Sequence, residues 1–297
     1  MQEVAPDIAM IDTLLGGVPG VTAAYLATGP RPALIDPGAR TSAPAVRAAL
    51  AAAGLGADDL HWIVLTHVHL DHCGATGILA AAFPRARVVV HRRGARHLSE
   101  PARLVAASAA VYRERWSLYG GLDRTPAERV LGVEDGHRVD LGGGRRLRMV
   151  EALGHARHHM SVLDESTGAL IAGDALGVRL RGGGLHPALP PPDVDLDAAD
   201  ASLGRLARLD PSVLCLSHFG PAGDPAETIA LAGRQLAAIR SAAEARDDEG
   251  GLAARIERAL PLEATVGDPA ALALWRRLGW AEANVEGVAA WIVSRAG

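Results

Sequence analysis

The chain has 297 residues, of which 49% are hydrophobic but only 3% are aromatic, and its formal net charge is −4. All 30 basic residues are arginine, and the lack of lysine excludes Schiff-base chemistry and a P-loop phosphate site. A mildly acidic chain also argues against general binding to nucleic acid, because phosphate contacts supply most of that affinity.

The sequence carries no recognisable signal for export or for a membrane. Its N-terminus lacks a basic start followed by an apolar run, and nothing approaches the ~20 consecutive apolar residues of a membrane span. Two cysteines, Cys73 and Cys215, do not make a disulfide framework. We therefore expect a cytoplasmic protein that does not associate with membranes.

The first part of the chain alternates strand and helix patterns. Residues 22–26 and 33–35 are predicted strands, and the second one ends at the stop signal Asp36-Pro37-Gly38. Ser42 is a predicted cap for a helix that runs to about residue 53. The apolar run 62–66 predicts a strand covered on both faces. A helix at 75–83 and a strand at 88–91 follow.

The second part begins with a helical pattern at 94–120, interrupted near residues 99–101. Short strands with glycine turns are predicted for 138–173, followed by a Gly- and Pro-rich loop at 182–193. The last predicted elements are a helix at 198–209, a strand at 213–217 and helices at about 226–245, 251–260, 269–278 and 283–295. Two sheets packed face to face with helices outside satisfy this order best.

The most informative segment is HVHLDH at residues 67–72, which places four potential metal ligands directly after a buried strand. In an extended loop alternate side chains point the same way, so His67 and His69 can converge on one ion. When the chain then enters a helix, Asp71 and His72 can turn toward a second ion. Imidazole and carboxylate are ligands that zinc and its neighbours prefer. A polar surface loop is the alternative, but it leaves charged groups at the end of a buried strand uncompensated.

Six residues cannot complete two coordination shells, so further ligands must come from downstream. Three candidates lie just past apolar runs, where strands deliver side chains to one edge of a sheet: His155, Asp174 and His218. Taken singly, each reads as an ordinary turn or loop residue. Together with the HVHLDH segment they predict a site of seven ligands, namely His67, His69, Asp71, His72, His155, Asp174 and His218.

This series resembles the ligand series of the metallo-β-lactamase superfamily, which has HxHxDH, then Gly-His, then Gly-Asp after an apolar strand, then a late Ser-His. The resemblance implies that His67, His69 and His155 hold one ion. It implies that Asp71, His72 and His218 hold the second, and that Asp174 bridges the two.

The same resemblance implies an α/β fold, a four-layer αββα sandwich. Residues 1–224 would form the catalytic domain, with a helical insert at about 94–120. Residues 225–297 would form a helical C-terminal extension packed on that domain.

Several further residues are candidates for the surroundings of the metals. Residues 154–159 resemble the family's Gly-His-x-x-Gly-His segment, in which His158 stands where glycine is usual and His159 matches the second histidine. We expect His159 to orient a ligand or a substrate group. His158 and His186 are placed where they could contact substrate.

The insert holds Tyr112, Trp116 and Tyr119, a large share of the few rings in the chain. These rings could form a lid or pocket wall over the metals, or could pack the insert onto the sheet. Three arginines of the insert could meet an anionic substrate or lie on exposed helix surface: Arg103, Arg113 and Arg115. We expect the C-terminal tryptophans to serve packing or a homodimer contact rather than catalysis: Trp275, Trp280 and Trp291.

The resemblance implies a dinuclear metal-dependent hydrolase of a small-molecule ester (lactone, thioester or phosphoester) that uses a metal-bridging hydroxide. Asp71 is the expected catalytic residue, which orients that nucleophile and moves its proton. Two divalent ions are expected, with zinc as first choice and manganese, iron or nickel as alternatives. A lactone or other carboxylic ester is the preferred substrate, because no clear glutathione-binding set supports a thioesterase.

Three other functions remain open. An iron-dependent oxidoreductase of the persulfide dioxygenase type shares the fold, but Asp71 and His72 complete a hydrolytic second site. A nuclease or phosphodiesterase of the same superfamily is disfavoured by the acidic charge and the lack of a clamp domain. A non-catalytic binding protein is hard to reconcile with a full ligand set. The expected partner is thus a small-molecule substrate rather than nucleic acid.

Overall fold

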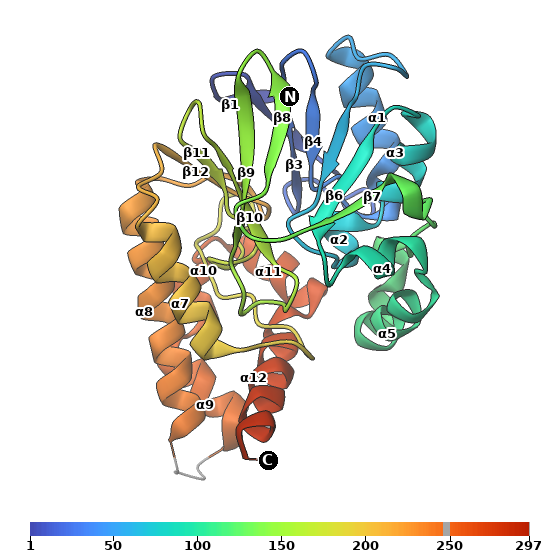
Figure 1. The fold of residues 1–297 in the computed structure, drawn as a ribbon. Coiled ribbons are helices and arrows are strands. Elements are labelled where there is room, and N and C mark those ends of the chain that lie inside the picture. Colours follow the sequence, from blue (N-terminus) through green and yellow to red (C-terminus); the bar gives the residue numbers. More distant parts are fainter. Residues whose placement is uncertain (246–249, 297) are drawn as a thin grey trace.

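A computed structural model describes residues 1–245 and 250–296, and its strands form two sheets that pack face to face (Figure 1). The parts of the expected C-terminal extension at 246–249 and 297 lie outside the described residues. In the described ranges no helix is both long and apolar enough to cross a membrane.

The first sheet follows the order of the chain. Its strands are β1 (Gln2–Ala5), β2 (Ile8–Asp12), β3 (Ala23–Ala27), β4 (Ala33–Ile35), β5 (Trp62–Val64), β6 (Arg87–His91) and β7 (Val130–Val133). Pairing is antiparallel from β1 to β4 and parallel from β4 to β7. The parallel strands β5 and β6 are short and apolar because both of their faces are covered.

The second sheet runs through the later part of the chain. Its spatial order is β13 (Gly220–Pro221), β12 (Val213–Leu216), β11 (Ala169–Ile171), β10 (Met160–Asp164), β9 (Arg145–Glu151) and β8 (Arg138–Gly142). The pair β11–β12 is parallel and the other pairs are antiparallel.

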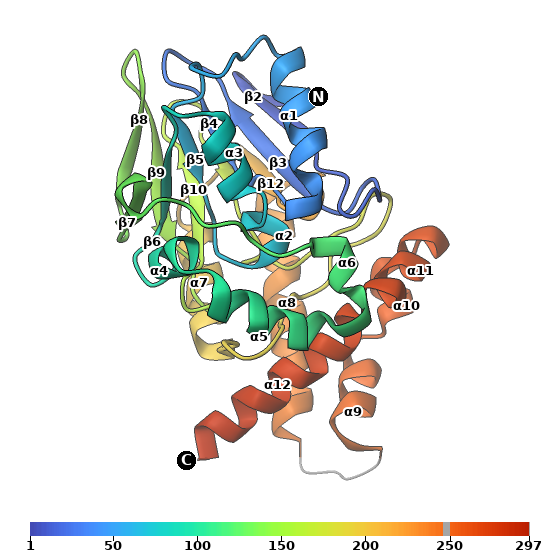
Figure 2. The ribbon, with the colours of Figure 1, turned by 90° about the vertical axis from the view of Figure 1, so that its right-hand side faces the viewer.

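Helices cover the outer face of each sheet, which gives four layers (Figures 1 and 2). The first sheet carries α1 (Ala43–Ala52) and α3 (Thr76–Ala82), and the second carries α7 (Leu196–Ala207) and α8 (Pro225–Glu244). A short helix, α2 (Leu70–Cys73), lies at the end of the first sheet. The expected αββα sandwich is therefore confirmed.

Alternation along the strands builds three apolar clusters. On β3, Tyr25 points between the sheets, whereas its neighbour Leu26 points outward to α1 and α3. The cluster between the sheets also takes Met149 from β9 and Ile171 from β11. Because successive strand side chains face opposite ways, one apolar strand can serve both layers.

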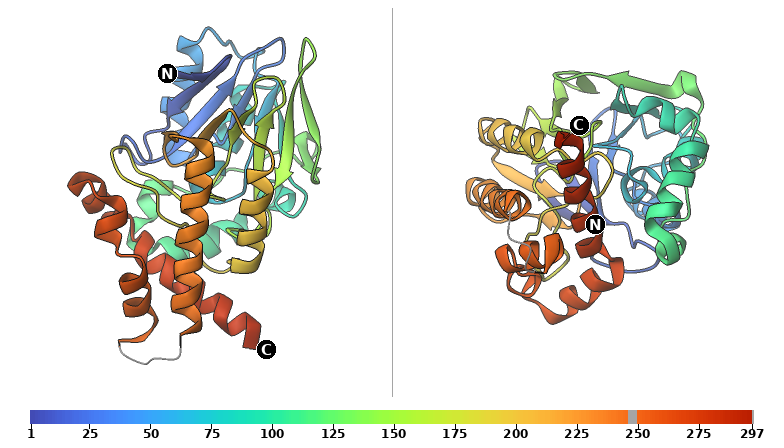
Figure 3. Two further views of the ribbon diagram at one scale, coloured as in Figure 1. Left: turned by 90° about the vertical axis from the view of Figure 1, so that its left-hand side faces the viewer. Right: turned by 90° about the horizontal axis from the view of Figure 1, so that it is seen from below.

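The remaining helices form two groups at the end of the molecule away from the N-terminus (Figures 1 and 3). The insert comprises α4 (Ala95–Ser99), α5 (Ala102–Tyr112), the 3-10 turn η2 (Arg113–Arg115) and α6 (Trp116–Tyr119). The C-terminal group comprises α9 (Gly251–Ala259), α10 (Leu262–Val266), α11 (Pro269–Leu278) and α12 (Trp280–Ala296). Side chains of the insert contact both α11 and α12.

The structure corrects the prediction for Ser42 and adds elements that the sequence pattern did not reveal. Ser42 makes no side-chain capping hydrogen bond, because a 3-10 turn, η1 (Arg40–Ser42), precedes α1 and already gives Ser42 helical dihedrals. The N-terminal hairpin β1–β2, the strand β7 and the short helix α10 were not predicted. Each has four or five residues, too short to show a clear period.

A close approach of α7 to the loop after β9 requires glycine at position 154. Gly154 has φ +125°, and a Cβ there would lie 2.4 Å from both the backbone N and Cα of Ala199. The Gly154 carbonyl accepts a hydrogen bond from the Asp195 N–H, just before α7. Gly154 therefore fixes the backbone from which the His155 side chain projects.

We expect Gly154→Ala to destabilise the fold more than Gly143→Ala does. Gly143 also has a positive φ (+62°), but a Cβ there meets nothing within 4 Å. The control should lose about 1–2 kcal/mol in the free energy of unfolding from left-handed strain alone. Gly154→Ala should lose about 1–3 kcal/mol more from overpacking. Urea unfolding of both variants measures the difference, and equal losses would contradict the close approach.

Candidate metal centre

The HVHLDH loop leaves β5 and enters α2, as the sequence indicated. His67 and His69 lie in the loop, and His69 has the extended backbone that precedes the first turn of α2. Asp71 and His72 lie within that turn. The α2 turn is held against the first sheet, because Gly38 N–H donates to the His72 carbonyl.

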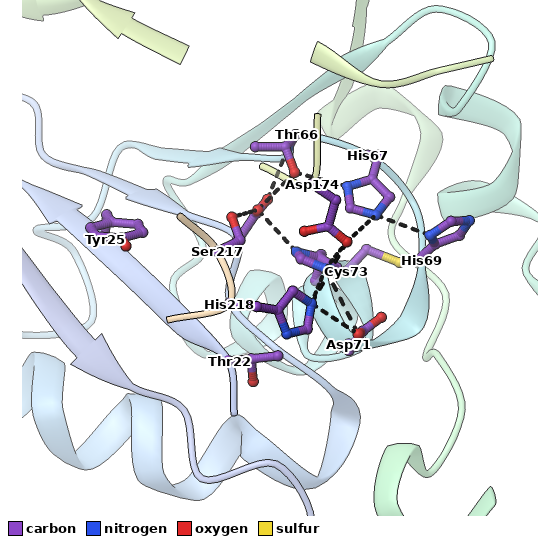
Figure 4. Close-up of polar contacts among 12 residues, drawn as sticks. Thr22, Tyr25, Thr66, His67, His69, Asp71, Cys73, Asp174, Ser217 and His218 are labelled. Atoms are coloured by element: carbon purple, nitrogen blue, oxygen red, sulfur yellow. Dashed lines mark hydrogen bonds and ion pairs between the residues drawn. The ribbon is translucent and has the colours of Figure 1, made fainter. Parts of the chain in front are cut away.

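Two triads of potential ligands form from the predicted residues. Figure 4 shows members of both beside Asp174: His67 and His69 of the first triad, and Asp71 and His218 of the second. In the first, His69 Nδ1 lies 3.1 Å from His67 Nε2 and 2.9 Å from His155 Nε2. In the second, His218 Nε2 lies 3.2 Å from His72 Nε2 and 3.4 Å from Asp71 Oδ2. Within each triad the ligand atoms all lie within 4.8 Å of one another.

Asp174 stands between the triads. Its Oδ2 lies 3.9 Å from His67 Nε2 and 3.5 Å from His155 Nε2 in the first triad. The same oxygen lies 3.4 Å from His72 Nε2 and 3.6 Å from His218 Nε2 in the second. The other oxygen, Oδ1, is buried without a hydrogen-bond partner among the described residues. The structure thus brings all seven predicted ligands together, with Asp174 in the bridging position.

In four of the histidine ligands, Nδ1 faces an oxygen on the side of the ring away from the other ligands. These contacts determine which ring nitrogen carries the proton and which keeps its lone pair. The Nδ1 contacts are His67 with Thr66 Oγ1 (2.9 Å), His72 with Asp36 Oδ2 (3.1 Å), His155 with the Ala188 carbonyl (2.8 Å) and His218 with the Val21 carbonyl (3.0 Å). Carbonyl and carboxylate oxygens only accept, and the Thr66 hydroxyl gives its proton to Asp36 Oδ2 at 2.7 Å. Each Nδ1 therefore donates, and each neutral ring keeps its lone pair on Nε2.

Four Nε2 lone pairs consequently converge on one carboxylate oxygen of Asp174. The contact between His72 Nε2 and His218 Nε2 has no proton to share when both rings are neutral, so it is repulsive unless a cation lies nearby. Neutral imidazoles held by an outer hydrogen bond, together with carboxylates, are the donor set that binds divalent metals in proteins. The residues present fit a pair of such ions.

The ionisation of the ligand residues also indicates a site for cations. Burial and neighbouring rings lower the pKa of His67 and of His69 well below the usual value. Burial also acts to lower the pKa of His72, but the Asp174 and Asp71 carboxylates outweigh it and raise that pKa well above the usual value. Burial opposes ionisation of Asp71, yet His72 and His218 bring its pKa down to about 2. The second triad therefore needs positive charge, which divalent cations would supply.

Asp36 is a residue of the site that the sequence did not reveal. Its carboxylate accepts hydrogen bonds from the Thr66 N–H (2.8 Å) and hydroxyl (2.7 Å), from His72 Nδ1 (3.1 Å) and from the Ser217 hydroxyl (2.9 Å). Asp36 is buried and has φ +50°. In the sequence, Asp-Pro-Gly indicated only the end of a strand. A buried aspartate in the left-handed region ties the ligand loop to the strand that carries His218.

His159 lies where it can orient the bridging carboxylate. Its Nε2 accepts a hydrogen bond from the Asp174 N–H at 2.9 Å, and burial lowers its pKa well below the usual value. His158 lies instead beneath the ligand loop, where its Nδ1 faces the Val68 N–H at 3.5 Å. His186 is held behind the site by Thr265 Oγ1 at 2.9 Å.

A cavity opens over the metal centre between the insert and the C-terminal helices. Of the pocket residues proposed from the sequence, Tyr112 and Tyr119 line it, stacked with their centroids 3.7 Å apart. Trp116, His158 and His186 do not line it, because they pack behind its walls. Two further residues line it: Arg115, one of the three insert arginines considered for an anionic substrate, and Trp280, which was not expected there.

Trp280 corrects the expectation that the C-terminal tryptophans serve only packing. Its ring meets that of His218 edge-on at 5.0 Å, so the start of α12 reaches the metal centre. Trp275 and Trp291 are buried, as packing residues are. Cys73 is also buried, and burial raises the pKa of its thiol well above the usual value, which disfavours a nucleophilic role.

We expect Asp36→Asn to lower the free energy of unfolding by about 3 kcal/mol, because a buried amide cannot accept all four donors. Metal affinity should fall about 10–100-fold, as for other changes that misorient ligands. Denaturant unfolding and metal titration measure both effects. Asp140→Asn, at the exposed ion pair with Arg31, is the control and should change neither. Wild-type affinity in Asp36→Asn would contradict the role given to Asp36.

Comparison with known proteins places this geometry in a family. The family model described as the Metallo-beta-lactamase superfamily matches residues 16–218, more than half of the chain. The metallo-beta-lactamase fold-containing protein ST1585 of Sulfurisphaera tokodaii is 34% identical over 167 residues. The probable metallo-hydrolase YqjP of Bacillus subtilis is 26% identical over 220 residues. These matches cover 55% and 66% of this chain, and 62% and 66% of the two relatives, slightly less than two thirds of their lengths.

Structural comparison points to the same superfamily and covers more of the chain than the sequence matches do. The crystal structure of the archaeal superfamily protein ST1585 from Sulfolobus tokodaii superposes with a TM-score of 0.70 at 28% identity. That superposition covers 95% of this chain and 98% of the other. The chain belongs to the metallo-beta-lactamase superfamily.

Proposed function

We propose that this protein is a dinuclear metal-dependent hydrolase of a small-molecule ester, with a lactone or other carboxylic ester as the preferred class. The observation that supports it is the pair of triads joined by Asp174 Oδ2, with ring lone pairs directed inward. We infer that two divalent ions, zinc by preference, occupy these triads. When bound, such ions acidify water and polarise the oxygen under attack.

The chain's own residues complete the proposed mechanism. Asp71 lines the cavity, and its pKa of about 2 keeps the carboxylate ionised, so it can orient a water by accepting its hydrogen bond. We assign to the Asp71 carboxylate the transfer of that water's proton toward the leaving group. Asp174 holds the two triads together, and His159 positions the Asp174 backbone. The Tyr112, Tyr119 and Trp280 rings narrow the cavity and exclude bulk water from the reacting ester.

We expect purified protein to contain close to two equivalents of metal and to hydrolyse at least one substrate from a screen of lactones, aryl esters, thioesters and phosphodiesters. His69→Ala should lose that activity by a factor of about 10³ or more, because the first triad would lack a ligand. His137→Ala, a histidine with no partner in the site, should keep it. Metal analysis and initial rates are the measurements.

Two outcomes would contradict this proposal. Equal turnover by wild type and His69→Ala would show that the triads are not responsible for hydrolysis. Iron content combined with oxygen uptake, and no ester turnover, would favour the oxidoreductase alternative instead.

A further inference from the structure

The outer wall of the cavity is formed by two segments far apart in the chain. Tyr112, Arg115 and Tyr119 come from the insert, and Gly279 and Trp280 come from the turn between α11 and α12. Figure 2 shows α6 beside α11 at this point. A substrate bound at the triads would therefore extend toward this wall.

Arg115 is the one basic side chain among the described residues that line the cavity. It ends η2, and its Nε donates to the Arg277 carbonyl at 2.9 Å, near the C-terminus of α11. Its guanidinium packs on Gly279, where a Cβ would lie 2.3 Å from Arg115 Cζ. The absence of a side chain at position 279 thus creates the space that the guanidinium occupies.

Among the described residues, no carboxylate lies closer to the terminal nitrogens of Arg115 than 3.9 Å. The carboxylate paired with it is that of Glu114, whose Oε1 is 3.9 Å away and whose side chain is 81% exposed. The Arg115 side chain is only 26% exposed. A guanidinium has five N–H donors in a planar fork that matches carboxylate and phosphate oxygens. The hydrogen bond that holds α11 uses only Nε of Arg115. The two terminal nitrogens of the guanidinium can therefore donate to a ligand in the cavity.

Arg113 offers a useful contrast two residues earlier. Its side chain is 66% exposed and pairs with Glu286 on α12 at 3.3 Å. Arg113 does not line the cavity. Both arginines therefore tie η2 to the C-terminal helices, Arg113 to α12 and Arg115 to α11, but only Arg115 lines the cavity.

We propose that Arg115 binds an anionic oxyacid group, carboxylate or phosphate, on the substrate, and so selects anionic esters. This inference rests on the proposed hydrolase function. The stacked Tyr112 and Tyr119 rings and the Trp280 ring supply apolar surface between that group and the triads. In such a partly desolvated cavity a bidentate, charge-assisted contact is stronger than it is in water.

Three phenyl esters with matched acyl chains test this selectivity. One chain ends in a carboxylate (phenyl hydrogen glutarate), one in a phosphonate, and one in the neutral methyl ester. Arg115→Met should lower kcat/KM for at least one anionic ester about 10–100-fold, the usual loss for a charge-assisted pair. It should leave the neutral ester within about threefold of wild type. The anionic ester with the larger loss identifies the group.

Two variants control for indirect effects. Arg113→Met, which removes a charge outside the cavity, should leave all three rates unchanged. Arg115→Lys keeps the charge without the fork, so it should fall between wild type and Arg115→Met, and it serves if Arg115→Met does not fold. Equal losses on all three esters, or the same pattern in Arg113→Met, would overturn the proposal.

A binding measurement separates this inference from the hydrolase proposal. If wild type turns over none of these three esters, calorimetric titration of the metal-loaded protein with glutarate and with propylphosphonate decides the role of Arg115, whereas the hydrolase proposal fails only if the wider screen of lactones, aryl esters, thioesters and phosphodiesters also shows no turnover. At least tenfold weaker binding of either probe to Arg115→Met than to wild type and Arg113→Met supports the inference. Equal binding by the variants, or no binding of either probe to wild type, overturns it.

Discussion

The hydrogen bonds on the outer side of the histidine rings are the constraint on which the site depends. Each neutral ring carries one N–H proton. In His67, His72, His155 and His218 this proton is on Nδ1, which donates a hydrogen bond to an oxygen away from the other ligands. The inner nitrogen of each ring is therefore left as a lone-pair donor. A ring that flipped would lose its outer bond and direct a proton at the other ligands. The ring orientations are thus set before any metal binds, and His72, whose pKa is raised, releases its Nε2 proton when a metal binds.

Three of those four oxygens, on Val21, Asp36 and Thr66, lie beside strands of the first sheet, and the fourth, the Ala188 carbonyl, lies in the loop between β11 and α7. Asp36 follows β4 in the first sheet, and Ser217 and His218 follow β12 in the second. The Ser217 hydroxyl donates to Asp36, and the Ala23 N–H donates to the Ser217 carbonyl, so the sheets are joined beside the ligands. The contacts that pack the two sheets together therefore also hold the ligands in place.

The ligands could be predicted from sequence because each follows an apolar strand, a local pattern that spacing reveals. Asp36 could not, since Asp-Pro-Gly is a common turn signal and only the folded chain shows four donors converging on its carboxylate. The cavity wall was predicted only in part. Tyr112 and Tyr119 were found because aromatic residues are rare in this chain, whereas Arg115 and Trp280 line the cavity from segments that lie far apart in the sequence. No local sequence pattern predicts that two such distant segments meet. The same applies to Ser42, which does not cap α1 because the 3-10 turn before it already gives Ser42 helical dihedrals.

Crystals of the protein grown with zinc, with anomalous scattering measured at the zinc edge, test the central claim most directly. Our account predicts two peaks, one among His67, His69 and His155 and the other among Asp71, His72 and His218, with Asp174 contacting both. Peaks elsewhere, or rings turned so that Nδ1 of His72 or His218 faces the ion, would contradict it.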